Sequence, residues 1–189
     1  MLPPSGFDDY EKVILKICES FPNINHLIFT SSTGIYQNTT GIVDEDSKVD
    51  ENNMVYRAEQ AIKKIFPKRH TILRLSGLVS EDRHPVKYLL QKDIVSGGKT
   101  PVNLVHREDV IRAIKLLLSS SSYGETFNLS YPDHPCRDEY YNSFARRFYQ
   151  KEINFSNEGI GKTIDGSKFA KYFEYEYLMS IRDIEINNN

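Results

Sequence analysis

The chain has 189 residues, of which 39% are hydrophobic and 26% charged, and its formal net charge is -2. This length suits one globular domain, and the absence of a basic run interleaved with aromatics argues against a nucleic-acid partner. No apolar run approaches the roughly 20 residues that span a bilayer, so no membrane role is expected. Cys18 and Cys136 have no metal or redox spacing, which indicates free thiols in a reducing compartment and predicts a cytoplasmic protein.

Predicted helices and strands alternate along the first half of the chain. Apolar residues at three- and four-residue spacing predict a helix over 10–21, and residues 27–30 read as an apolar strand. A polar loop over 37–53 follows, then a second helix over 55–66 and a β-branched strand over 71–75. Strands without polar alternation are typical of parallel sheets covered on both faces. The pattern therefore predicts a doubly wound α/β sheet.

The second half continues with less regular elements. An extended segment at 101–105 leads into a predicted helix over 107–118, whose early acidic residues favour a helix N-terminus. A loop over 119–122 precedes a strand over 126–129, and an aromatic-rich helix is predicted over 137–149. The last residues, 187–189, are expected to fray.

The first predicted strand runs into three hydroxyl residues, Ser31, Ser32 and Thr33. Doubly wound sheets bind ligands beyond the carboxyl ends of their strands. Hydroxyls at that point can hold a substrate carbonyl or alcohol and stabilise its charge during hydride transfer. On these three residues alone, a turn that caps the chain is the favoured interpretation.

Six segments, in this order, resemble the NAD-dependent epimerase/dehydratase family of extended short-chain dehydrogenase/reductases. The segments are 31–36, 43–45, 72–78, 82–85, 102–110 and 124–129. This resemblance covers nearly the whole chain. It implies a partial Rossmann-like doubly wound parallel sheet, with the N-terminal strands absent, and a small C-terminal substrate-binding lobe.

The resemblance also implies a division of the chain. Residues 1–130 would form the distal part of a Rossmann-like NAD(P)-binding domain with interleaved lobe segments, and residues 131–189 mainly the substrate-binding lobe. The glycine-rich dinucleotide turn of the family is expected before strand 27–30, yet residues 1–25 contain no such turn. We therefore expect a truncated domain in which this strand has an unpaired flank, a feature that invites self-association.

Site residues carry over from the family by position. Ser32 matches the catalytic hydroxyl residue and Thr33 a neighbour that faces substrate, while Tyr56 stands where the catalytic tyrosine base is expected. Gln60 occupies the position of the family's lysine, which lowers the tyrosine pKa and holds the nicotinamide ribose. Ser31 and Gln60 are the predicted cofactor contacts.

Alternatives remain open for several of these residues. Tyr56 is equally well a helix-face aromatic, although Lys63 or Lys64 can approach it from the next turn. Arg83 is predicted to contact a substrate phosphate or carboxylate, with a solvated loop as the equal alternative. His106 is assigned to the substrate cleft, where it would orient backbone.

Three further side chains receive structural interpretations. Arg74 follows a predicted strand into the cleft, and a buried guanidinium requires a carboxylate or carbonyl partner. Arg137 and Lys162 fall in the predicted lobe as surface or capping residues. No zinc-helix, nucleophile-elbow or phosphate-loop motif is present, so no metal site is expected.

Three functions follow from these observations. The favoured one is the distal part of an NAD(P)-dependent epimerase, dehydratase or reductase for a nucleotide sugar or similar small carbonyl or alcohol compound, inactive as this chain. The alternative is a non-catalytic remnant that self-associates or binds a protein partner through an exposed sheet edge. The third is a reduced enzyme that uses Ser32 and Tyr56 with a cofactor held in another way, for example across a dimer. NAD or NADP is the implied cofactor, and whether this chain binds either is left open.

Overall fold

The computed structural model describes residues 6–121 and 123–187. Residues 188 and 189, which were expected to fray, lie outside the described residues. The helices are α1 (Tyr10–Ser20), η1 (Thr33–Ile35, a 3₁₀ turn), α2 (Met54–Ile65), α3 (Val86–Leu89), α4 (Arg107–Leu118), α5 (Arg137–Tyr149) and α6 (Ser167–Phe173). The strands are β1 (Leu27–Ser32), β2 (Gly41–Val43), β3 (His70–Leu75), β4 (Gly77–Val79), β5 (Leu104–His106), β6 (Glu125–Leu129) and β7 (Lys162–Ile164).

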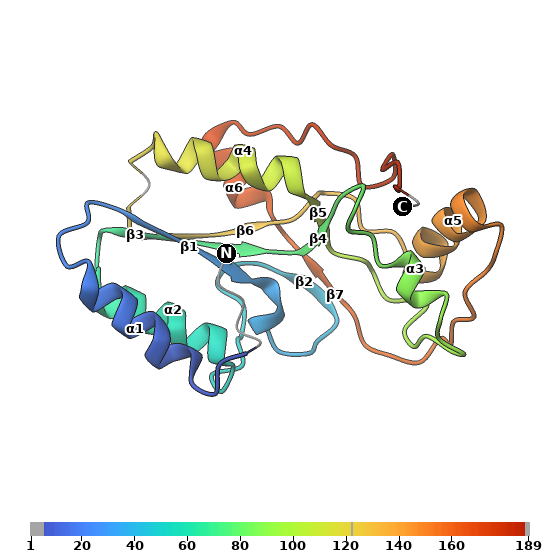
Figure 1. Cartoon of the computed structure of the whole chain (residues 1–189), viewed down its shortest axis with the longest axis horizontal. Coiled ribbons are helices and arrows are strands. Elements are labelled where there is room, and N and C mark those ends of the chain that lie inside the picture. The colour runs from blue at the N-terminus through green and yellow to red at the C-terminus, as the bar shows by residue number, and fades with distance from the viewer. Residues whose placement is uncertain (1–5, 122, 188–189) are drawn as a thin grey trace.

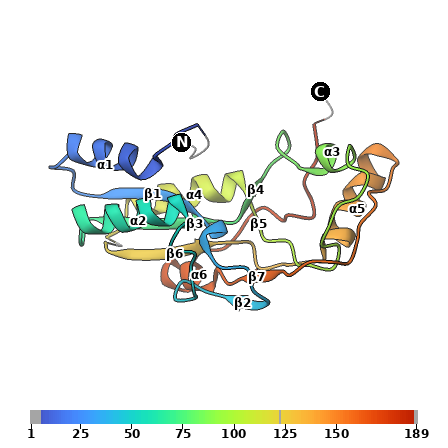
Figure 2. The ribbon, with the colours of Figure 1, turned by 90° about the horizontal axis from the view of Figure 1, so that it is seen from below.

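The main sheet is parallel and has the order β1-β3-β6. Helices α1 and α2 cover one face, and α4 and α6 cover the other (Figure 1). Figure 2 shows the same layers after a quarter turn, with β1 and β6 at opposite edges of the sheet. The predicted doubly wound α/β fold is confirmed. Among the described residues β1 pairs with β3 alone, so the second edge of β1 carries no strand.

Two apolar clusters hold the layers together. All six residues of β3 are buried, which explains why its sequence shows no polar alternation. On the α1/α2 face the fully or nearly fully buried residues are Tyr10, Ile14, Cys18, Phe29, Ala58, Ile62, Phe66 and Ile72. On the α4/α6 face they are Leu73, Leu75, Val105, Val110, Ala113, Leu117, Phe127, Leu129, Phe169 and Tyr175.

Short strands lie where the sequence predicted loops or extended segments. β2 lies inside the predicted loop over 37–53 and pairs in parallel with the distant β7. β4 pairs in parallel with β5. The extended segment predicted at 101–105 forms a strand only at Leu104–His106. These strands have three residues each, too few for periodicity to identify them.

Helix ends follow the expected capping chemistry. Asp9 accepts a hydrogen bond from the Lys12 amide (3.0 Å), and the Asn53 side chain accepts one from the Val55 amide (2.9 Å). His106 caps α4, since its Nδ1 accepts from the Glu108 amide at 3.2 Å. No helix in the described ranges is long and apolar enough to cross a bilayer.

A third cluster forms a separate lobe around α3 and α5, at one end of the molecule in Figure 1. Its buried members are Val79, Val86, Leu89, Val95, Val102, Leu104, Tyr140, Tyr141, Phe144, Ala145, Ile153, Ile181 and Ile184. The final segment of the chain returns to this lobe, because Tyr140 donates to the Ile181 carbonyl at 2.9 Å.

His84 lies among the aromatic rings of this lobe. Its ring centroid is 4.3 Å from that of Phe144, and its Nε2 lies 3.2 Å from the Tyr140 hydroxyl. Burial lowers the pKa of His84 from 6.5 to about 4. The folded state therefore binds this proton more weakly than the unfolded state.

We predict that the free energy of unfolding falls as pH drops from 6.5 to about 4, with His84 contributing up to about 3 kcal/mol of the loss. Above pH 6.5 the imidazole is neutral in both states, and its contribution is fully present. Urea unfolding of His84→Phe at pH 7 and pH 4.5 checks this. The variant should lose less stability than the parent chain across that range, and equal losses would contradict the prediction.

Candidate functional site

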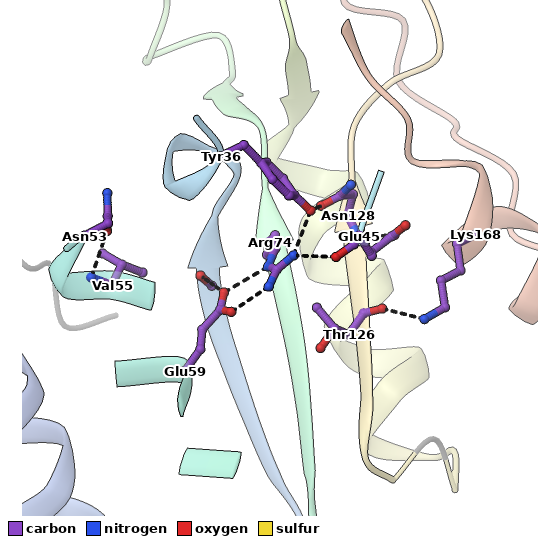
Figure 3. Close-up of polar contacts among 10 residues, drawn as sticks. Tyr36, Glu45, Asn53, Val55, Glu59, Arg74, Thr126, Asn128 and Lys168 are labelled. Atoms are coloured by element: carbon purple, nitrogen blue, oxygen red, sulfur yellow. Dashed lines mark hydrogen bonds and ion pairs between the residues drawn. The ribbon is translucent and has the colours of Figure 1, made fainter. Parts of the chain in front are cut away.

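A buried ion pair joins α2 to the main sheet beneath the carboxyl ends of its strands (Figure 3). Arg74 of β3 donates from Nη2 to Glu59 Oε2 at 2.8 Å and from Nε to Oε1 at 3.1 Å. The Ser31 hydroxyl of β1 donates to the same Oε1 at 2.5 Å. Arg74 is 3% exposed and Glu59 0%, so this bidentate pair is fully removed from water. The partner expected for a buried Arg74 is thus Glu59.

The network continues across the sheet. Arg74 Nη1 donates to the Tyr36 hydroxyl at 2.8 Å and to the Glu45 carbonyl at 3.1 Å. The Tyr36 hydroxyl in turn donates to Asn128 Oδ1 of β6 at 2.7 Å, and the backbone N–H of Asn128 donates to Glu45 Oε1 at 2.6 Å. These residues come from β3, β6 and two loops, and the strand register places Arg74 beside Asn128.

Electrostatics fixes the charge states in this network. Burial alone would lower the pKa of Arg74, but the Glu59 carboxylate outweighs it and raises that pKa. Burial raises the pKa of the Tyr36 phenol, with Arg74 opposing part of the effect. Burial also raises the pKa of Glu45. The guanidinium remains charged and the phenol remains protonated, so the network is a fixed scaffold.

The three hydroxyl residues at the end of β1 have different surroundings. Ser31 is buried and its proton is used by Glu59. Ser32 is exposed, and its Oγ accepts from the Gly34 amide at 3.0 Å, which caps η1. Thr33 is 8% exposed and donates to the Leu75 carbonyl at 3.3 Å. Of the three, Ser32 presents its hydroxyl to solvent beyond the strand end.

Tyr56 and Gln60 lie one turn apart on α2. The Tyr56 ring is partly buried against the apolar cluster that contains Ile35 and Tyr36, and Gln60 is exposed. No hydrogen bond joins Tyr56 to Ser32 among the described residues. Lys63, two turns from Tyr56, is partly buried, and burial lowers its pKa.

Arg83 lies in the turn after β4, and His106 is the last residue of β5. Arg83 is exposed and forms an isolated bridge with Ser80, while His106 is fully buried. His106 Nε2 faces Glu81 at 3.4 Å without hydrogen-bond geometry. Glu81 also pairs with Arg107 at 3.6 Å. His106 thus caps α4 and neighbours a carboxylate.

A cavity of about 390 Å³ lies between the loop after Ser32 and the lobe. Asn38 and Thr39 of that loop line it together with two cations, Arg137 and Lys162. Lys162 Nζ donates to the Tyr36 carbonyl at 2.7 Å, and burial lowers its pKa. Arg137 donates from Nη1 to the Ser96 carbonyl at 2.9 Å. Lys162 therefore connects the cavity wall to the backbone at Tyr36, which follows Ser32 and η1 in the chain.

Sequence reasoning did not find Glu59, Tyr36, Asn128 or Glu45 as members of one network. One signal was available for Glu59, because it adjoins the buried Ala58 on α2 and precedes Ile62 by three residues. A carboxylate on the inner face of a helix, near a buried strand arginine, indicates an ion pair. The described residues contain no group of three or more His, Cys, Asp or Glu placed to hold a metal.

No family model matches this sequence. Protein YeeZ of Escherichia coli strain K12 is 37% identical over 166 residues, an alignment that spans 82% of this chain and 59% of that protein. The chain thus spans about three-fifths of the length of the curated relative that it matches.

Several solved structures share this fold. UDP-glucuronic acid 4-epimerase from Bacillus cereus, in complex with NAD, superposes with a TM-score of 0.78 at 18% identity, covering 95% of this chain and 68% of that chain. dTDP-glucose 4,6-dehydratase from Bacillus anthracis, also with NAD, has a TM-score of 0.72 at 18% identity, covering 93% and 64%. A functionally unknown conserved protein from Silicibacter pomeroyi gives 0.76 at 14% identity, covering 96% and 72%. The expected resemblance to the fold of the NAD-dependent epimerase/dehydratase family is confirmed.

Proposed function

We propose that this chain forms the substrate-facing part of an NAD(P)-dependent epimerase, dehydratase or reductase that acts on a nucleotide sugar or a similar small carbonyl or alcohol compound. The observation that carries the proposal is the exposed Ser32 hydroxyl at the carboxyl end of β1. After η1 the chain continues into a loop whose Asn38 and Thr39 line a cavity that holds two cations. Parallel α/β sheets bind ligands at this end. We also propose a cytoplasmic location, which the free thiols of Cys18 and Cys136 support.

Ser32 is the residue that we assign to the reacting oxygen. Its hydroxyl can donate to a carbonyl or alcohol oxygen and stabilise the charge that develops there. The buried network beneath it is rigid, because Ser31, Glu59 and Arg74 lock β1 to β3 and α2. Such preorganisation is what a strand-end hydroxyl needs in order to act on a transition state.

Tyr56 is the proposed base, with Gln60 at the nicotinamide ribose. A neutral amide cannot stabilise a phenolate as an ammonium does. We therefore propose that turnover by these residues is slow or absent. The test is Tyr56→Phe in an assay with UDP-glucuronic acid and NAD that is sensitive enough to detect turnover by the parent chain. Measurable turnover that the variant leaves unchanged removes Tyr56 as the base.

The described residues fit only the nicotinamide end of a dinucleotide. Ser32, Tyr56 and Gln60 offer polar atoms there, and Ser31 is engaged by Glu59. The three strands of the main sheet end in Ser32-Thr33, Ser76-Gly77 and Ser130-Tyr131, none of which is a glycine-rich phosphate turn within the described ranges. A bound NAD or NADP would supply the hydride acceptor.

Arg137 and Lys162 are proposed to hold the diphosphate of the substrate. Both line the cavity beside the loop from Ser32, and guanidinium and ammonium groups form charge-assisted hydrogen bonds to phosphate. Thr33, Arg83 and His106 remain predicted substrate contacts. Of these, Arg83 alone is exposed.

Calorimetric titration of the full chain with UDP-glucuronic acid tests this assignment. We expect saturable binding that Arg137→Gln and Lys162→Gln each weaken about tenfold or more, since each removes a charged hydrogen-bond donor. Arg146→Gln is the matched control on the same helix, because Arg146 is exposed and pairs with Glu152. Binding that is equally weakened by all three variants, or no heat from a folded sample, would refute the assignment.

A second candidate function is favoured by the free edge of β1. Among the described residues this edge has no strand partner, and an unpaired edge can add a strand from another chain. The chain would then be a non-catalytic module that self-associates or binds a protein partner. Sedimentation equilibrium distinguishes the two: a monomer at all concentrations argues against self-association through this edge.

A further inference from the structure

A second cavity lies at the opposite edge of the main sheet from β1. It is bounded by the residues that follow β6, by β7 and by α6. Its volume is about 470 Å³, within the range of small-molecule sites. None of the residues assigned above to substrate or cofactor lines it.

Two buried hydroxyl groups of this cavity donate to no acceptor in the described part of the chain. They are Ser130 Oγ, from a residue that is 2% exposed, and the Tyr177 hydroxyl. A buried hydroxyl without a partner is costly, so its presence in a cavity wall indicates an oxygen or nitrogen atom that completes it. Burial raises the pKa of the Tyr177 phenol, and a hydrogen bond from the Ser130 backbone to its oxygen opposes part of this effect. The phenol therefore keeps its proton and can donate it.

The rest of the wall is mainly apolar. Ile42, Ile164, Ala170 and Tyr175 line it, and Ile42, which is 77% exposed, lies where a ligand would enter. Aliphatic and aromatic walls with a few converging polar groups are typical of sites for ring-containing ligands. The volume admits a bicyclic ring system.

The charge of the cavity selects among such ligands. Asp165 lines it, and no lysine or arginine is found among its described lining residues. Lys168 on α6 is engaged by Glu125 at 3.0 Å. An anion would be repelled by the Asp165 carboxylate. In this respect the cavity differs from the first one, whose Arg137 and Lys162 side chains suit a phosphate group.

From the two hydroxyls that lack an acceptor and the mainly apolar wall that carries the Asp165 carboxylate, we infer that this cavity binds a neutral aromatic compound that carries a hydroxyl or carbonyl oxygen. The ring packs against Ile164 and Tyr175, and its oxygen accepts from Ser130 and Tyr177. The inference stands independently of the proposed oxidoreductase function, because no residue is shared between the two sites.

Amide-resolved NMR titration of the full chain with 2-naphthol, and with naphthalene as the probe that lacks the oxygen, tests it. We expect saturable shifts at Ser130, Ser167 and Ala170, with a dissociation constant of about 0.1–1 mM for a ligand of this size. No saturable shifts around the cavity up to the solubility limit of 2-naphthol, in a folded sample, would overturn the inference.

Variants separate hydrogen bonding from simple partitioning. Ser130→Ala and Tyr177→Phe should each weaken 2-naphthol about five- to tenfold and leave naphthalene unchanged. Ser76→Ala is the matched control, because Ser76 Oγ is also buried and unpartnered but does not line this cavity. Ala170→Phe should fill the space and abolish binding of both probes. Equal weakening of both probes by the two hydroxyl deletions would overturn the inference even if Ala170→Phe fails to fold.

Discussion

Glu59→Ala is expected to lower the free energy of unfolding by about 3–5 kcal/mol. The variant leaves the Arg74 guanidinium, which is 3% exposed, without its bidentate carboxylate. It also removes the acceptor of the Ser31 hydroxyl. A buried charge without a partner costs far more than the pair contributes, because its desolvation is no longer offset.

Urea unfolding followed by circular dichroism measures the effect of Glu59→Ala. Glu152→Ala is the matched control, since Glu152 pairs with Arg146 where both side chains are more than half exposed, and it should cost less than about 1 kcal/mol. The double variant Glu59→Leu/Arg74→Met removes both charges and should recover most of the loss. A cost for Glu59→Ala no greater than that of Glu152→Ala would show that the ion pair is not buried in solution.

Asp109→Ala is expected to cost about 3–5 kcal/mol through a different mechanism, the loss of one acceptor for several donors. The Asp109 carboxylate accepts from the Leu178 and Met179 amides at 3.1 and 3.0 Å and from Arg112 at 2.7 Å. Its Oδ1 also lies 3.2 Å from the Tyr175 hydroxyl. These donors fix the segment after α6 against α4.

Hydrogen exchange gives Asp109→Ala a local signature. The Leu178 and Met179 amides should exchange faster than in the parent chain when their acceptor is removed, by a larger factor than the amides of the main sheet. Glu108→Ala is the control, because Glu108 shares the first turn of α4 and its helix-dipole effect but is exposed. Equal stability losses in the two variants would assign the effect to the helix dipole and refute the anchoring role.

The main elements were predictable because they depend on local periodicity and on burial of whole strands. The helix predicted over 137–149 has those bounds in the structure, and that predicted over 55–66 differs by one residue at each end. The strand predicted over 71–75 lies in the centre of the sheet, where every side chain is buried. The β2–β7 and β4–β5 pairs were not predictable, since pairing between distant three-residue segments depends on tertiary structure.

The candidate site was only partly predictable for a similar reason. The position of Ser32 at a strand end follows from the strand prediction. The contact between Tyr36 and Asn128 joins residues 92 positions apart, and no local pattern marks it. Orientation was also beyond the sequence, because Ser31 and Ser32 are adjacent yet point to a buried carboxylate and to solvent.

The most direct test of the account is an amide-resolved NMR titration of the full chain with UDP-glucuronic acid. The proposed function predicts saturable shifts that cluster at Ser32, Thr33 and Asn38 and at Lys162. Shifts confined to other surfaces, or none in a well-dispersed spectrum at millimolar ligand, would contradict a substrate site at the carboxyl end of β1 and favour the sheet-edge function.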